Sequence, residues 1–380
     1  MSGLYLHIPF CRQACHYCNF HFSTSLRYKE EMVRAIATEI RLRKDYLPKR
    51  PLSSVYFGGG TPSLLEKDDL ALLFNAINEH FELAENAEIT LEANPDDITP
   101  LRLLHWHESP VNRLSIGVQS FAEADLRYMN RAHSAQEAEQ CIEMAQLAGF
   151  SNLTVDLIYG TPGLTDEVWK ANVDKLIAAG VPHISCYALT VEPKTALAYQ
   201  VEKGTSPPVE EDQAARQYEL LMEWLNAAGY VHYEISNFAL PGKEAVHNGN
   251  YWRAEPYLGV GPSAHSFNGV ARQWNRANNA AYMKAVSALE NNGFTEEWAS
   301  TLYEEELLSE VDQYNEYILT GLRTSWGVDA DRLKEPYRQY FLDKIYNYIG
   351  DFVEKKEKAV YSLTPKGRLL ADRISSDLFY

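Results

Sequence analysis

Three cysteines near the N-terminus are the residues of this sequence best suited to chemistry. Cys11, Cys15 and Cys18 are spaced C-x-x-x-C-x-x-C directly after a β-rich run. Three thiolates this close can bind one [4Fe-4S] cluster and leave its fourth iron without a protein ligand. S-adenosylmethionine (SAM) can chelate that iron, accept an electron and give a 5′-deoxyadenosyl radical. The alternatives are a zinc site with His16 or His21 as fourth ligand, or an electron-transfer cluster completed by a remote cysteine.

A glycine run follows the second β-rich segment. Its residues are Gly58, Gly59, Gly60 and Thr61, followed by a proline. Glycines at a strand end let the backbone approach a ligand closely, and an exposed carbonyl there can accept a hydrogen bond from an ammonium group. A simple turn is the alternative. The position one strand away from the cysteine loop favours a ligand site.

Polar residues follow or end several apolar strands. Glu92, Gln119 and Asp156 each stand near the end of such a run, and Arg131 follows soon after Gln119. Carboxylates at the mouth of a barrel suit ribose hydroxyls, and an arginine can pair with the carboxylate of SAM. Any single one of these residues could instead cap a neighbouring helix. The whole series indicates a binding face.

A histidine-rich region lies further along the chain. His247 begins the motif His-Asn-x-x-Tyr-Trp, which ends at Trp252, and a Gly-Val-Gly-Pro-Ser-Ala-His-Ser stretch over 259–266 follows it. Histidine beside large aromatic side chains can ligate haem iron. A surface loop with a hydrogen-bonded histidine is the alternative.

Alternating β-rich and helical segments should position these residues. The β-rich runs are Leu4–Ile8, Ser54–Phe57, Glu88–Ala93, Arg113–Val118, Leu153–Ile158 and Ile184–Ala188. The helical stretches are Leu26–Tyr46, Leu70–Phe81, Ser134–Ala148, Glu167–Ala179 and Glu210–Ala228. Ser134 and Glu137 form a predicted capping box. Six βα units in series predict an α/β fold, a partial (β/α)6 barrel of the TIM type, with its active face at the C-terminal ends of the strands.

The pattern changes near residue 300. Acidic and aromatic helices are expected over Glu304–Leu322 and Tyr337–Ile349, followed by a hairpin-like stretch and a last helix, which resembles a winged-helix unit. Residues 301–380 hold 15 acidic and 11 basic side chains, which argues against DNA binding. We therefore expect a barrel over 1–235, a connecting segment over 236–299 and a C-terminal helical or winged-helix-like domain over 300–380.

Composition narrows the classes of protein. The 380 residues carry a formal charge of −17 and are 46% hydrophobic, so a large core is expected and nucleic acid is not an expected partner. No apolar run reaches the roughly 18 residues of a membrane span. Three clustered cysteines suit a reducing compartment, so we expect a cytoplasmic protein that does not span the membrane. Cys141 and Cys186 are expected to be small buried hydrophobes.

The motifs together resemble a known family. Tyr5-Leu-His7-Ile-Pro9-Phe10 before the cysteines, the Gly-Gly-Gly-Thr-Pro, Glu-Ala-Asn-Pro and Asp-Leu-Ile-Tyr-Gly segments and the His-Asn-x-x-Tyr-Trp motif are similar to the HemN-like branch of the radical SAM superfamily. Within that branch the chain looks most like the HemW-type haem chaperones. The resemblance extends over nearly the whole chain.

The resemblance implies specific sites and partners. Besides the three cluster cysteines, it implies a set of SAM contacts: Tyr5, Tyr17, Gly59, Gly60, Thr61, Glu92, Gln119, Arg131, Asp156 and Ala188. It makes His247 the candidate haem ligand. It also implies delivery of haem b to haem-dependent proteins, some of them at the membrane, by a monomer or homodimer.

The second interpretation is an oxygen-independent coproporphyrinogen III dehydrogenase, which oxidatively decarboxylates propionates to vinyl groups. Two departures from those enzymes argue against it. Their cluster motif continues to a further cysteine where this chain has Asn19-Phe20, and they carry an N-terminal extension where this chain starts almost at the motif.

Overall fold

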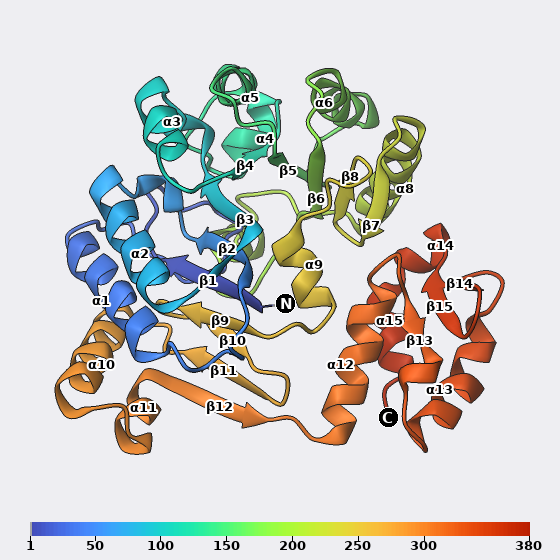
Figure 1. The fold of residues 1–380 in the computed structure, drawn as a ribbon. Coiled ribbons are helices and arrows are strands. Elements are labelled where there is room, and N and C mark those ends of the chain that lie inside the picture. The colour runs from blue at the N-terminus through green and yellow to red at the C-terminus, as the bar shows by residue number, and fades with distance from the viewer. Residues whose placement is uncertain (1) are drawn as a thin grey trace.

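Six parallel strands organise the first half of the chain in the computed structural model, which describes residues 2–380 (Figure 1). They are β1 (Ser2–Ile8), β2 (Leu52–Gly59), β3 (Leu83–Ala93), β4 (Arg113–Gln119), β5 (Leu153–Tyr159) and β6 (His183–Ala188). They lie side by side in sequence order, each paired in parallel with the next. The predicted α/β fold with a partial (β/α)6 barrel is confirmed.

Helices connect these strands and pack on the outer face of the sheet (Figure 1). They are α1 (Lys29–Leu42), α2 (Lys67–His80), α3 (Pro100–His107), α4 (Glu123–Tyr128), α5 (Ala135–Leu147) and α6 (Asp166–Ala178). Two further helices, α7 (Ala196–Glu202) and α8 (Glu211–Ala227), follow β6. The predicted capping box is confirmed at α5, where the Ser134 side chain accepts from the Glu137 amide and Glu137 caps in return. Parallel strands with helical crossovers bring their C-terminal ends to one rim, where ligands bind in such folds.

The sheet continues beyond both ends of this parallel set. Beyond β6 lie β8 (Asn237–Ala239) and β7 (Val231–Glu234), and beyond β1 lie β9 (Tyr257–Val260), β10 (His265–Phe267), β11 (Ala271–Asn275) and β12 (Tyr303–Leu307). Only β9 of these added strands runs parallel to its neighbour, β1, so its C-terminal end lies at the same rim as that of β1. Three more helices accompany these strands: α9 (Val246–Trp252), α10 (Asn279–Asn292) and α11 (Glu296–Leu302).

One predicted helix is wrong in its first part. The pattern over Glu304–Leu322 predicted a single helix, but Tyr303–Leu307 forms β12, and the helix α12 spans only Glu310–Leu322. The acidic run pairs antiparallel with β11, and Gln273 donates to Glu305 across the two strands. Strand pairing with a neighbour distant in sequence overrides local helical preference here.

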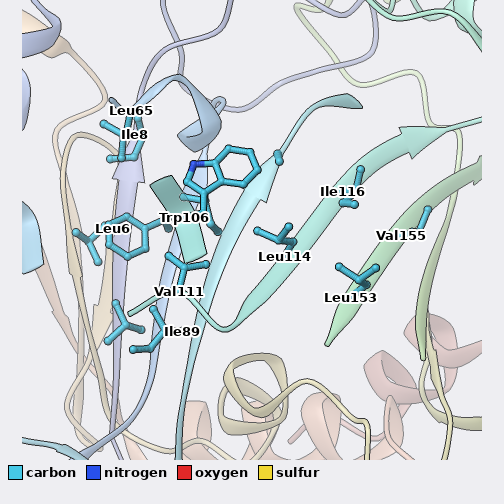
Figure 2. Packing of buried hydrophobic residues seen from close by; sticks show 14 of the residues in the cluster. Leu6, Ile8, Leu65, Ile89, Trp106, Val111, Leu114, Ile116, Leu153 and Val155 are labelled. Carbon is cyan, nitrogen blue, oxygen red and sulfur yellow. The ribbon is translucent and has the colours of Figure 1, made fainter. Parts of the chain in front are cut away.

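Alternate residues of the strands, which share one face of the sheet, form the main core with apolar residues of the helices. Figure 2 shows Leu6 and Ile8 on β1, Leu114 on β4 and Val155 on β5, with Trp106 of α3 packed among the core side chains. Trp106 is 1% exposed. Each such aliphatic side chain contributes about 1.5–3 kcal/mol when fully buried. The barrel is therefore a rigid frame for its rim.

The C-terminal region has a core of its own, built around Ile318, Phe341 and Ile374. Besides α12 it contains β13 (Val328–Asp329), α13 (Tyr337–Ile345), β14 (Val353–Lys355), β15 (Val360–Leu363), α14 (Pro365–Arg368) and α15 (Ala371–Asp377). The three strands pair in the order β13-β15-β14. The predicted domain boundaries and the likeness to a winged helix stay predictions.

Helix α9 lies between the barrel and this C-terminal region (Figure 1). The Arg253 guanidinium stands 4.3 Å above the Trp326 ring, and Arg323 stands 5.6 Å above Trp252. These reciprocal cation–π contacts fasten the C-terminal region against the end of the histidine motif. Within residues 2–380, no helix combines the length and apolar character of a bilayer span.

Candidate functional site

A pocket of about 430 Å³ opens at the C-terminal rim of the barrel. It collects all three predicted cluster cysteines and all but one of the predicted SAM contacts. The predicted residues that line it are Cys11, Cys15, Tyr17, Cys18, Gly59, Gly60, Thr61, Glu92, Gln119, Arg131, Asp156 and Ala188. Residues separated by up to 177 positions in sequence therefore meet because their strands end together.

The cysteine loop follows β1 and is held by backbone hydrogen bonds. The amide of Cys11 donates to the Ser23 carbonyl at 3.1 Å, and the amide of His16 donates to the Met129 carbonyl at 3.0 Å. All three cysteines of the loop are free thiols at intermediate burial. Three unpaired thiols facing one pocket are a donor set that fits a [4Fe-4S] cluster with one open iron.

Burial favours the protonated form of two of these thiols, Cys11 and Cys18. It raises the pKa of Cys11 to about 11 and also raises the pKa of Cys18. Thiolates are the form that ligates iron, and a bound metal ion deprotonates its thiol ligands. Binding of a metal ion would therefore favour ionisation of Cys11 and Cys18.

Arg131 supplies the positive charge beside the loop. Its two terminal nitrogens donate to the Cys15 Sγ at 3.1 Å, to the Asn94 Oδ1 at 2.8 Å and to the Gly117 carbonyl at 2.7 Å. Its buried Nε has no partner among residues 2–380. A buried donor without a partner costs free energy, so the site fits an anionic ligand that would satisfy it.

Two carboxyl groups face the same pocket. Burial raises the pKa of Glu92 to about 7 and that of Asp156 to about 6. The Tyr56 hydroxyl donates to the Glu92 Oε1 at 2.8 Å. Both groups are hydrogen-bond acceptors when ionised, and hydroxyl and ammonium groups of a ligand would favour that form.

The glycine run has a packing role in addition to the predicted close approach of its backbone to a ligand. A side chain at Gly60 would place its Cβ 2.6 Å from the Phe10 carbonyl oxygen and 2.8 Å from that of Ile8. Gly59 has φ +104° and would bring a Cβ to 2.6 Å from the His7 ring. The glycines thus let β2 lie against the start of the cysteine loop as well as border the pocket.

Several lining residues were missed by the sequence reasoning. They include Asn94, Ser115, Gly117, Tyr187, Thr190 and Glu192. Ser115 and Gly117 lie at alternate positions before Gln119 on β4, so the period of two was a usable signal for the shared face. Tyr187 and Glu192 carried no such signal, because their position depends on how the chain turns after β6.

Tyr5 and His247 lie outside the residues that line the pocket. Tyr5 sits on β1 behind it, with its hydroxyl 3.2 Å from the His7 Nδ1. The His247 ring stacks 5.0 Å from the Tyr56 ring, which separates it from Glu92. The roles predicted for Tyr5 and His247 stay predictions.

His247 is 2% exposed and both of its ring nitrogens are engaged. Its Nδ1 lies 2.8 Å from the Ser54 Oγ, and its Nε2 lies 2.8 Å from the Tyr251 hydroxyl. Its backbone amide donates to Glu88, near the N-terminal end of the parallel part of β3. Helix α9 therefore covers the end of the barrel opposite the cysteine loop and places His247 there.

Comparison with known proteins agrees with the motifs. The Radical SAM superfamily profile matches residues 5–176. A protein named heme chaperone HemW from Mycobacterium tuberculosis is 36% identical over 98% of this chain and 93% of its own length. Another HemW, from Bacillus subtilis, is 33% identical over 98% of both chains. The chain belongs to the HemW family. The predicted family resemblance is confirmed.

The chain also shares its fold with a solved structure. Coproporphyrinogen III oxidase (HemN) from Escherichia coli superposes with a TM-score of 0.83 over 100% of this chain and 90% of that one, at 23% identity. At this identity the match concerns the fold alone. The superfamily membership implies a [4Fe-4S] cluster and SAM as the cofactors of this protein, and the free thiols and unpartnered Arg131 Nε fit both.

Proposed function

We propose that this protein binds haem and delivers it to haem-dependent proteins. The observation that carries the proposal is the relationship, over 98% of the chain, to several proteins named heme chaperone HemW. We propose haem b as the cargo. A carrier must release what it holds, so exchangeable ligation by a histidine suits the task better than a covalent link.

Cys11, Cys15 and Cys18 would hold the cluster in this proposal, and the residues at the rim pocket would hold SAM. A cluster with SAM on its open iron supplies one-electron reductive cleavage of SAM. The protein's own contribution is positional: Arg131 would pair with the SAM carboxylate, and Glu92 and Asp156 would accept hydrogen bonds from its polar hydrogens.

The charge of the pocket favours this proposal over a coproporphyrinogen dehydrogenase. The substrate of that enzyme carries four propionates. Among the described residues that line the pocket, Arg131 is the one cation, whereas Glu92, Asp156 and Glu192 are acidic. A pocket with more acids than bases repels a tetracarboxylate more than it attracts it.

The cysteines also suggest where the protein works. All five are free among the described residues, and three of them lie in a loop at intermediate burial. Thiols placed like this persist in a reducing compartment, so we propose the cytoplasm. Acceptor proteins at the membrane are compatible with that location.

A haem titration with a parallel turnover assay tests the proposal. The protein is reconstituted anaerobically with iron and sulfide, and one aliquot is titrated with haem while a second receives coproporphyrinogen III, SAM and reductant. Saturable haem binding without porphyrinogen turnover is the expected result. Turnover in the absence of haem binding would return the chain to the decarboxylases.

A further inference from the structure

Haem ligation requires an imidazole nitrogen that is free to reach the iron. His247, the histidine of the His-Asn-x-x-Tyr-Trp motif, is sealed in the barrel with both nitrogens engaged. His265 is its opposite. The residue is exposed at the start of β10, and among residues 2–380 no hydrogen bond engages either of its ring nitrogens.

His265 faces an open pocket of about 400 Å³ near the C-terminal end of β9. The strand register places His265 directly opposite Trp274 on β11, and Trp274 directly opposite Glu304 on β12. Directly opposed residues share one face of a sheet. The three side chains therefore form a row across the floor of this pocket.

We propose that the cargo haem binds in this pocket with its iron on His265, an inference that rests on the haem-carrying function proposed above. The pocket is open, so part of the macrocycle stays in solvent, as suits a cargo that must leave. The site differs from the rim pocket, and the two share none of their lining residues.

The ring geometry defines how a macrocycle would sit. An imidazole that ligates haem iron stands upright on the porphyrin plane. The Trp274 ring is tilted only 31° from the His265 ring, with the centroids 6.4 Å apart. Trp274 would therefore meet the same porphyrin face with its edge, which is the favourable edge-to-face arrangement of aromatic groups.

A positively charged side chain that could bind a propionate of the haem borders the pocket. Arg276 is two residues beyond Trp274, and its Nε and one terminal nitrogen donate to the carbonyls of Thr301 and Ser300. Its other terminal nitrogen is 4.0 Å from Glu304, beyond hydrogen-bond distance. A propionate could take that nitrogen in a charge-assisted hydrogen bond.

The protonation state of His265 also suits a ligand. Partial desolvation by the surrounding protein and the nearby Arg272 charge lower the pKa of His265 below its usual value. A neutral imidazole is the form that binds metal. The acidic side chain that lines the same pocket is Glu304, and its carboxylate lies 4.0 Å from the Arg276 guanidinium.

A buried polar network holds this pocket in shape. Glu39 of α1 accepts from the Gly261 amide at 2.8 Å, the Asn275 Nδ2 at 2.8 Å and the Tyr282 hydroxyl at 2.6 Å. Gly261 precedes His265, and Asn275 follows Trp274. The two sides of the pocket are therefore tied to one buried carboxylate, which pre-organises the site.

The pocket also adjoins the continuation of the cysteine loop. Asn278 and Ala281 line the pocket, and the Oδ1 of Asn279, between them, accepts a hydrogen bond from the His21 Nε2 at 2.7 Å. His21 is three residues beyond Cys18. The proposed haem site and the cluster loop thus contact the same end of α10.

Haem titration of the cluster-reconstituted protein and its His265→Ala variant tests the inference. We expect the wild type to show the absorption and electron paramagnetic resonance spectra of histidine-ligated ferric haem. The variant should lose these spectra and bind haem roughly 100-fold more weakly. That factor is the upper end of the effect of removing a residue that only orients a metal ligand. Added imidazole should restore the spectra in the variant.

Two further variants sharpen the test. His107→Ala removes an exposed histidine of α3 and should leave the spectra unchanged. Trp274→Ala should weaken binding but keep the histidine-ligated spectra. If His265→Ala keeps wild-type spectra and affinity while His247→Ala loses them, the inference is overturned and the carrier function stands. If the wild type binds no haem, the carrier function itself fails.

Discussion

Arg131 offers the sharpest test of the rim pocket, through the variant Arg131→Gln. In the wild type its terminal nitrogens are occupied by Cys15, Asn94 and Gly117, while its buried Nε lacks a partner. We expect the Nε to donate to the carboxylate of SAM. Glutamine keeps an amide donor on a shorter side chain and removes the positive charge, so it cannot replace that contact.

The magnitude follows from the kind of bond that is lost. One hydrogen bond between charged groups contributes about 1.5–3 kcal/mol. A loss of that size raises the Kd for SAM by about 10- to 150-fold. The exposed Arg127 of α4 supplies the matched control, since Arg127→Gln removes the same charge close in sequence but outside the pocket lining.

Anaerobic equilibrium dialysis with labelled SAM measures the effect. Iron and sulfide content are determined on the same samples, because Arg131 also contacts Cys15 and the cluster must be complete for the comparison to hold. Arg131→Gln with full cluster content and an unchanged Kd would refute the role assigned to this arginine.

Three further predictions concern the cluster, the frame and the pocket. Cys15→Ser should abolish the broad absorption near about 400 nm that is typical of thiolate-bound iron–sulfur clusters, as recorded by visible spectroscopy after reconstitution. Glu39→Ala leaves Arg43 buried without its 3.2 Å ion-pair partner, and loss of a buried partner should lower the urea-derived free energy of unfolding by about 3–5 kcal/mol. Burial raises the pKa of Glu92 to about 7, so the folded state binds this proton more tightly than the unfolded state does. The free energy of unfolding of the wild type, relative to that of Glu92→Gln, should therefore fall as the pH rises from about 5 to 8. Urea titrations of the apo protein measure this difference.

Each of these has a matched control or a contradicting outcome. Cys141→Ser, at a buried cysteine of α5, should keep the cluster absorption, and a Cys15→Ser protein that keeps it would remove that residue from the ligand set. Glu31→Ala, at an exposed position of α1, should change stability little. A stability difference for Glu92→Gln that stays constant with pH would show that Glu92 does not titrate in this range.

The sequence predicted the barrel and its rim because both follow from local periodicity. Strands such as Arg113–Gln119 were recognisable from apolar runs, and parallel strands necessarily end together. The capping box at Ser134 is a short-range signal of the same kind. Glu92, Arg131 and the cysteines could therefore be predicted from the sequence to share one pocket at the rim.

What could not be predicted depends on contacts between distant segments. The acidic run that begins at Glu304 reads as helical but completes the sheet, because β11 supplies a pairing edge. His247 reads as an accessible motif histidine but is enclosed when α9 inserts against Ser54 and Glu88. The exposure of His265 likewise depends on the register between β10 and β11.

Haem transfer is the measurement that tests the central claim most directly. The reconstituted protein is loaded with one equivalent of haem, separated from free haem and mixed anaerobically with an apo-acceptor protein, and the acceptor's haem spectrum is followed over time. The account predicts that haem leaves this chain and appears in the acceptor faster than it is lost to a scavenger of free haem. Haem that never reaches the acceptor, or reaches it only at the rate of release into solution, would contradict a delivery function.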